Sequence, residues 1–109
     1  MATTYKVLAQ ANPSATTATS LYTCGSTLGA VVSTITICNQ ASSAASYRVA
    51  IRPAGATLAA QHYVAYDVAL AANDTTALTL GITLANTDVV TVYASSATLS
   101  FSAFGSELS

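Results

Sequence analysis

Short runs in which apolar and polar residues alternate, separated by turn residues, are the feature that most limits how this chain folds. The run from Ser46 to Arg52 shows it best, since Tyr47, Val49 and Ile51 alternate with polar or small residues. Side chains on a β-strand point alternately to the two faces of a sheet, so a period of two predicts strands with one buried face. Several such runs with turns between them are typical of an antiparallel sandwich or barrel.

The same pattern along the chain predicts about eight strands and no convincing helix. The expected strands are residues 5–10, 20–24, 31–39, 46–52, 62–70, 75–84, 89–94 and 97–104. Gly81, inside the sixth run, indicates a bulge or a close backbone approach. Strands this short need a second sheet to cover them. We therefore predict one antiparallel β-sandwich domain over residues 1–109, immunoglobulin-like or jelly-roll-like, with a short N-terminal arm at residues 1–4.

The core of this sandwich is expected at the inward-facing strand positions. These positions are Val7, Val31, Ile35, Ile37, Tyr47, Val49, Ile51, Val64, Tyr66, Val68, Leu78, Leu80, Val90, Val92, Leu99 and Phe101.

Charged residues are scarce in this chain. Only 6% of the 109 residues are charged, against about 25% in an average soluble protein. The net charge is -1, with three Lys and Arg residues, so a nucleic-acid partner is not expected, because binding to a phosphate backbone requires clustered bases. About half of the residues are Ala, Ser or Thr, which lose little side-chain entropy on burial. This composition favours a subunit that is covered by neighbouring proteins.

No segment of the sequence indicates a membrane span or an export signal. Every apolar stretch of about 18 residues is interrupted by Ser, Thr, Asn or Gly. The start, Met1 to Thr4, has neither a basic region nor a long apolar region, so we expect synthesis in the cytoplasm without a signal peptide. Cys24 and Cys38 are then expected as free thiols, with a disulfide left open for a protein released from the cell.

Candidate catalytic and metal-binding residues are few and badly spaced. His62 and Asp67 fall on opposite faces of a regular strand, because their separation is odd, and no nucleophile motif accompanies them. Asp74 and Asp88 stand at strand starts, where such residues cap turns, and the spacing of the aspartates matches no calcium loop. We expect neither an enzyme nor a bound cofactor or metal.

A contact surface is predicted around the two arginines of the fourth strand. Arg48 and Arg52 share its outward face, and Tyr63 and Asp67 lie outward on the next strand. Tyr and Arg are enriched at protein interfaces and at their energetic hot spots. An anion site at the arginines is the alternative. The predicted protein interface is therefore Arg48, Arg52, Tyr63 and Asp67.

Almost the whole chain resembles a group of short proteins encoded by tailed bacteriophages, including phages of cyanobacteria. The resemblance rests on Tyr5 to Gln10, Arg52 to Thr57, Gln61 to Asp67, Ala72 to Thr76, Leu78 to Gly81, Thr87 to Tyr93 and Phe104 to Glu107. Cys24-Gly25-Ser26 departs from it, since relatives commonly have a Pro-containing stretch there. The resemblance implies a structural protein of the virion, either a tail, baseplate or fibre component or a capsid cement subunit, with other virion proteins as partners.

Two further expectations concern binding. A carbohydrate- or receptor-binding module is the alternative function, with outward Tyr63 and Tyr93 as the available aromatic side chains. Residues 75–84 and 89–94 carry no charge, so any sheet edge that they form lacks the charged residues that usually protect edges. We therefore predict a homo-oligomer or a complex with another virion protein.

Overall fold

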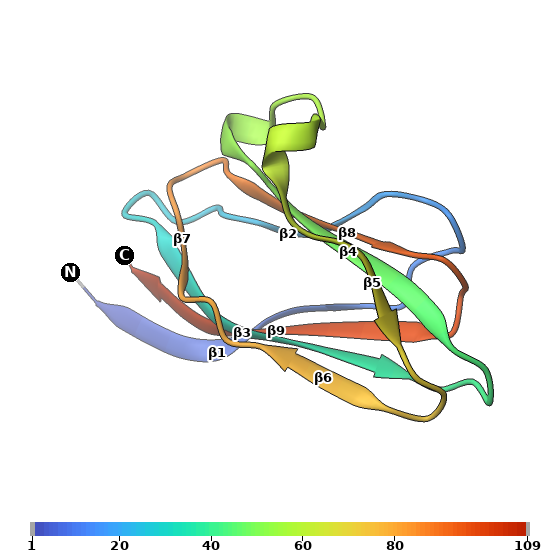
Figure 1. Ribbon diagram of the computed structural model, residues 1–109. Helices are drawn as coiled ribbons and strands as arrows, with labels where there is room; N and C mark the ends of the chain where they lie inside the picture. The colour runs from blue at the N-terminus through green and yellow to red at the C-terminus, as the bar shows by residue number, and fades with distance from the viewer. Residues whose placement is uncertain (1, 109) are drawn as a thin grey trace.

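Two antiparallel sheets pack face to face in the computed structural model, which describes residues 2–108 (Figure 1). The first sheet has the order β1-β9-β3-β6, with β7 also paired to β3, and the second has the order β2-β8-β4-β5. The strands are β1 (Thr3–Ala11), β2 (Thr19–Thr23), β3 (Ala30–Asn39), β4 (Ala45–Arg52), β5 (Tyr63–Leu70), β6 (Thr75–Leu78), β7 (Ile82–Leu84), β8 (Val89–Ala94) and β9 (Leu99–Leu108). The predicted β-sandwich is confirmed.

The strand boundaries differ from the predicted ones at a few places, each with a local reason. The run 75–84 divides into β6 and β7, because Gly81 has a φ of 60° and interrupts the extended backbone. Thr3 and Thr4 belong to β1 and pair with Leu108 and Glu107, so they are not part of an arm; residue 1 of the expected arm lies outside the described residues.

Two single 3-10 turns, η1 (Pro53–Gly55) and η2 (Ala60–His62), connect β4 to β5. They stand out from the second sheet, on the side away from the first sheet, at the top of the view in Figure 1. His62 therefore ends a turn, whereas we had expected it to begin a strand.

Most of the predicted core is buried between the two sheets. The correctly predicted buried residues are Ile35, Ile37, Tyr47, Val49, Val90, Val92, Leu99 and Phe101. Ile51 and Leu78 are partly buried and pack against this cluster. The prediction is wrong for five residues that are exposed, Val7, Val64, Tyr66, Val68 and Leu80.

A bulge in β3 explains why Val31 is not in the core. The pairing of β3 with β9 shifts between Val32 and Thr34, so Ser33 is an extra residue without a partner. An extra residue reverses which face the following side chains take. Val32 is therefore buried together with Ile35, while Val31 lies on the outer face of the sheet.

β5 contains two extra residues relative to β4. Tyr47 pairs with Val68 and Val49 with Ala65, and the next pair joins Ala50 to Tyr63. One extra residue of β5 therefore lies between the first two of these pairs, and a second lies between the last two. The regular alternation that we assumed for this strand is lost, and Val64 and Tyr66 are exposed. Val68 lies opposite the buried Tyr47, so its exposure comes from the position of β5 at the edge of the sheet.

The edges of the sheets also differ from expectation. β8 lies between β2 and β4, so residues 89–94 form a central strand and no edge. β6 and β7 do form an edge, but they are only 4 and 3 residues long. Short edge strands offer little backbone for pairing with another chain.

Candidate functional site

The outer face of the second sheet carries a cluster of aromatic and charged side chains around Arg48. The guanidinium carbon of Arg48 lies 4.2 Å from the ring centroid of Tyr66 and 4.2 Å from that of Tyr93. A guanidinium between two aromatic faces is attracted by the negative charge of the ring faces. Arg48 comes from β4 and Tyr93 from the adjacent position on β8, so the backbone register sets this contact.

Asp67 holds Arg48 in this position. Arg48 Nε donates to Asp67 Oδ1 at 2.6 Å, and Nη2 donates to Oδ2 at 3.3 Å. The hydrogen bond to Asp67 raises the pKa of the Arg48 guanidinium above its ordinary value. The two-point contact fixes the plane of the guanidinium, which a single bond would not do.

The irregular backbone of β5 places both partners of Arg48. Asp67 has a φ of 50°, a left-handed conformation that Asp tolerates better than most residues. Tyr66 comes immediately before it and is 57% exposed, although strict alternation placed it in the core. The bulge turns Tyr66 outward, so that Tyr66 and Asp67 both reach Arg48 from consecutive positions.

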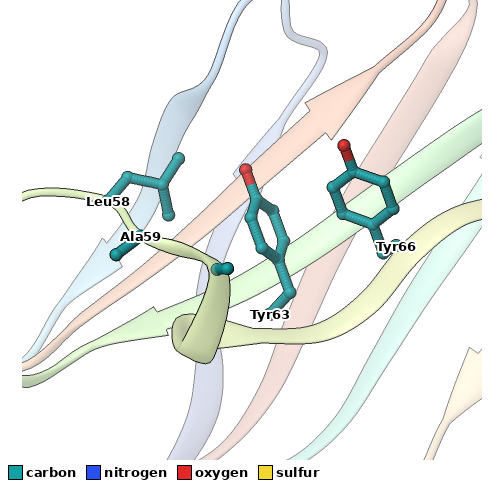
Figure 2. A pocket seen from close by; sticks show the side chains of 5 residues that line it. Leu58, Ala59, Tyr63 and Tyr66 are labelled. Carbon is teal, nitrogen blue, oxygen red and sulfur yellow. The ribbon is translucent and has the colours of Figure 1, made fainter.

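Tyr63 extends this cluster toward the 3-10 turns. Its ring meets that of Tyr66 edge to face, with centroids 4.9 Å apart and an interplanar angle of 84°. We call Arg48, Tyr63, Tyr66, Asp67 and Tyr93 the arginine–tyrosine patch. Figure 2 shows the two β5 tyrosines standing side by side, with their hydroxyl groups pointing the same way from the strand.

An open pocket of about 550 Å³ lies beside these two rings. It is lined by Leu58, Ala59, Ala60, Tyr63 and Tyr66 (Figure 2). The Ala59 backbone N–H donates to Nδ1 of His62 at 3.1 Å, and this bond links His62 to the pocket wall.

Arg52, the fourth predicted interface residue, has a different task. Its guanidinium donates to the hydroxyl oxygens of Thr91 and Ser20 and to the carbonyl oxygens of Gly55 and Ala56. It lies on the same face of β4 as Arg48, but these bonds tie the β4–η1 connection to β2 and β8. Arg52 therefore stabilises the scaffold beside the patch.

The structure thus brings Arg48, Tyr63 and Asp67 together and adds two residues to them. Tyr93 was considered only for the alternative function, although its outward position on β8 was readable from the alternation. Tyr66 was assigned to the core. The one local signal of an irregular strand was Asp67, the next residue in the sequence.

Asp74 and Asp88 accept hydrogen bonds from backbone N–H groups. Asp74 Oδ1 accepts from Thr75 N, and the two oxygens of Asp88 accept from Ala54 N and Ala85 N. Within residues 2–108 no group of three or more His, Cys, Asp or Glu side chains is placed to hold a metal ion. Helices long and apolar enough to cross a membrane are likewise absent from this part of the chain.

Comparison of the chain with protein-family models, with curated proteins and with solved structures gives no match.

Proposed function

We propose that this chain is a non-enzymatic structural protein of a tailed-phage particle that acts by binding other virion proteins. In this role it is a tail, baseplate or fibre component or a capsid cement subunit. The resemblance over almost the whole chain supports the particle, and the scarcity of charge supports a subunit covered by neighbours. A net charge of -1 argues against nucleic acid as the partner.

The observation that carries the binding role is the arginine–tyrosine patch. Arg48 is held between two rings and paired with a carboxylate, so little side-chain entropy remains to be lost when a partner covers it. Arg and Tyr are also the residue types that dominate binding energy at interfaces. A preorganised patch of this kind fits a partner protein that presents backbone carbonyls or a carboxylate to the guanidinium.

Mass spectrometry of purified particles tests the proposal. Heads and tails of a phage that carries the gene are separated, and the chain is expected in one fraction at a fixed ratio to a known structural protein. Its absence from both fractions would overturn the assignment to the particle.

A matched pair of variants tests the patch. In a phage lacking the gene, Arg48→Ala is expected to leave the particles without the chain, whereas Ser46→Ala should be incorporated normally. Ser46 lies two residues away on the same face of β4 and takes no part in the Arg48–ring or Arg48–Asp67 contacts. Equal incorporation of both folded variants would remove the patch as the interface.

The pocket beside Tyr63 favours saccharide binding as the second candidate function. Tyrosine rings offer apolar faces to sugar C–H groups, and the hydroxyl groups of Tyr63 and Tyr66 offer donors and acceptors. A glycan array separates the two functions. Binding that Tyr63→Ala abolishes would favour the saccharide site, whereas an array without signal leaves the patch to a protein.

A further inference from the structure

The two sheets have four edges, and three of them are poorly suited to pairing with another chain. β6 and β7 are short and interrupted at Gly81, and β2 has five residues with Leu21 as an extra residue. β5 has two extra residues and a left-handed backbone at Asp67. Short, bulged or interrupted edge strands are how soluble proteins avoid edge-to-edge association.

β1 is the exception among these edges. It is 9 residues long, and within residues 2–108 its strand partner is β9 alone. Its backbone N–H and C=O groups on the side away from β9 therefore form a row without a strand partner. Pairing with β9 is regular from Thr3 to Val7, and only then does Leu8 form a bulge.

Charged protection of this edge is limited to one residue. Lys6, the single charged residue of β1, is half-exposed and pairs with Glu107 at 2.8 Å. On the outer face, Tyr5 is 83% exposed and Val7 is 50% exposed. A long edge with exposed apolar side chains is the arrangement that accepts an added strand.

The outer face behind this edge carries no charge in β1, β9 or β3. Register and burial place the following side chains on it: Thr3, Tyr5, Val7, Gln10, Ser100, Ser102, Phe104, Ser106, Leu108, Val31, Thr34, Thr36 and Cys38. On this outer face, a partner that extends the sheet meets neither repulsion nor an ion that must be desolvated. A strand of the same composition satisfies this requirement.

We infer that β1 pairs with β1 of a second copy, antiparallel and about a two-fold axis at Tyr5. Tyr5 is the centre of the regular segment Thr3 to Val7, so this register uses all of it. Tyr5 then faces Tyr5 of the second copy, and Lys6 faces Thr4, so that no like charges are opposed. Directly opposed aromatic side chains stabilise antiparallel strands. The two first sheets become one continuous sheet, and the arginine–tyrosine patches stay free.

This pairing rests on the proposed function, because it names a second copy as one of the proteins that an assembly subunit binds. The two ideas nevertheless fail separately. Pairing is measured on purified protein, so its loss overturns this inference alone, while absence from particles overturns the function alone.

Sedimentation velocity over a range of concentrations tests whether the edge associates. The chain is expected to show a monomer–dimer equilibrium. Val7→Lys should weaken it by about tenfold or more, because it places a charge on the outer face of this edge, which has none. Val64→Lys is the matched control, since Val64 is 49% exposed and lies on the bulged edge strand β5. It should change the equilibrium by less than about twofold.

Two results would overturn the inference. One is a wild-type chain that stays monomeric at every concentration, and the other is equal weakening by the two variants. Far-UV circular dichroism confirms that each variant retains the β-sheet spectrum before it is measured.

Cysteine cross-linking tests the register. With Tyr5→Cys the two thiols face each other, with Cβ atoms about 5 Å apart, close to the span of a disulfide. With Thr3→Cys the thiols are four residue steps apart, or about 13 Å, and cannot join. Mild oxidation should yield a covalent dimer for the first variant and wild-type background for the second. Equal yields, or dimer from Thr3→Cys alone, would exclude the axis at Tyr5.

Discussion

The Tyr22 hydroxyl on β2 donates a hydrogen bond to the Glu107 carboxylate on β9, and this bond joins the two sheets at the end where β1 begins. The same carboxylate pairs with Lys6. Two hydrogen bonds lower the pKa of Glu107. The bond from Lys6 has the larger effect and the bond from Tyr22 the smaller. Burial and the bond to Glu107 raise the pKa of Tyr22.

We expect the chain to lose stability in acid through Glu107. A carboxyl group whose pKa is lower in the folded state stabilises the fold above its unfolded pKa, and this contribution is lost as the pH falls through the folded value. Glu107→Gln should lower the free energy of unfolding by about 1 kcal/mol at neutral pH and flatten its decline below about pH 4.5. Urea unfolding at several pH values measures both effects.

Two related variants check this assignment. Lys6→Met should flatten the acid decline partly, because the bond from Tyr22 remains. Tyr22→Phe should remove a loss of stability above about pH 10, since a group with a raised folded pKa stabilises the fold below its unfolded value and not above it. An acid decline in Glu107→Gln as steep as in the wild type would contradict the assignment.

Asn39 is expected to be the most costly polar residue to remove. It is 1% exposed, its Nδ2 donates to the carbonyl oxygens of Ser43, Leu70 and Ala71, and its Oδ1 accepts from Ala41 N and Thr98 Oγ1. Asn39→Ala leaves these groups without partners and should cost about 2–3 kcal/mol in chemical denaturation.

The neighbouring residue supplies the control for Asn39. Gln40 is exposed, and Gln40→Ala should cost less than about 0.5 kcal/mol. Asn39→Asp should be worse than Asn39→Ala, because a carboxylate oxygen would replace the donor that faces three carbonyls. Similar costs for Asn39→Ala and Gln40→Ala would show that the network contributes little.

Gly105 is required by the bulge in β3. A Cβ atom at Gly105 would lie 1.9 Å from the backbone oxygen of Val31, so the strands would have to separate. Gly105→Ala should destabilise the chain by about 3 kcal/mol. Gly25→Ala, where no atom lies within 4 Å of the new Cβ, should be neutral or slightly stabilising. Equal thermal stability of the two variants would contradict this view.

The two free cysteines should differ in reactivity. Cys24 is buried in the core, whereas Cys38 lies partly exposed on the outer face of the first sheet. In the native protein a thiol reagent should label Cys38 first, and Cys24 should react at the rate of unfolding. Mass spectrometry of the labelled peptides measures both rates, and equal labelling would indicate that the core opens readily at β2.

The sequence predicts the β-sandwich well because strand existence depends on local alternation, which is readable residue by residue. It fails where one extra residue reverses the faces, as at Ser33 and within β5. An extra residue leaves no trace in composition, because its position depends on the strand opposite. Tyr66, which contacts Arg48, was placed in the core for this reason. Arg48 and Asp67 were predicted correctly as surface residues.

Local sequence patterns also did not show which strands lie at the edges of the sheets. β8 and β1 both have few charges, yet one is central and the other is at an edge, because sheet order arises from long-range pairing. Charge scarcity alone therefore indicated a need for partners without showing which strand would meet them.

The two outer faces of the sandwich are chemically unlike. Arg48, Arg52 and Asp67 lie on the second sheet, whereas the outer face formed by β1, β9 and β3 has no ionised side chain. Turning a copy over would exchange an ionic surface for a neutral one. A layer built from such subunits therefore has a direction, with one side that responds to salt concentration and one that does not.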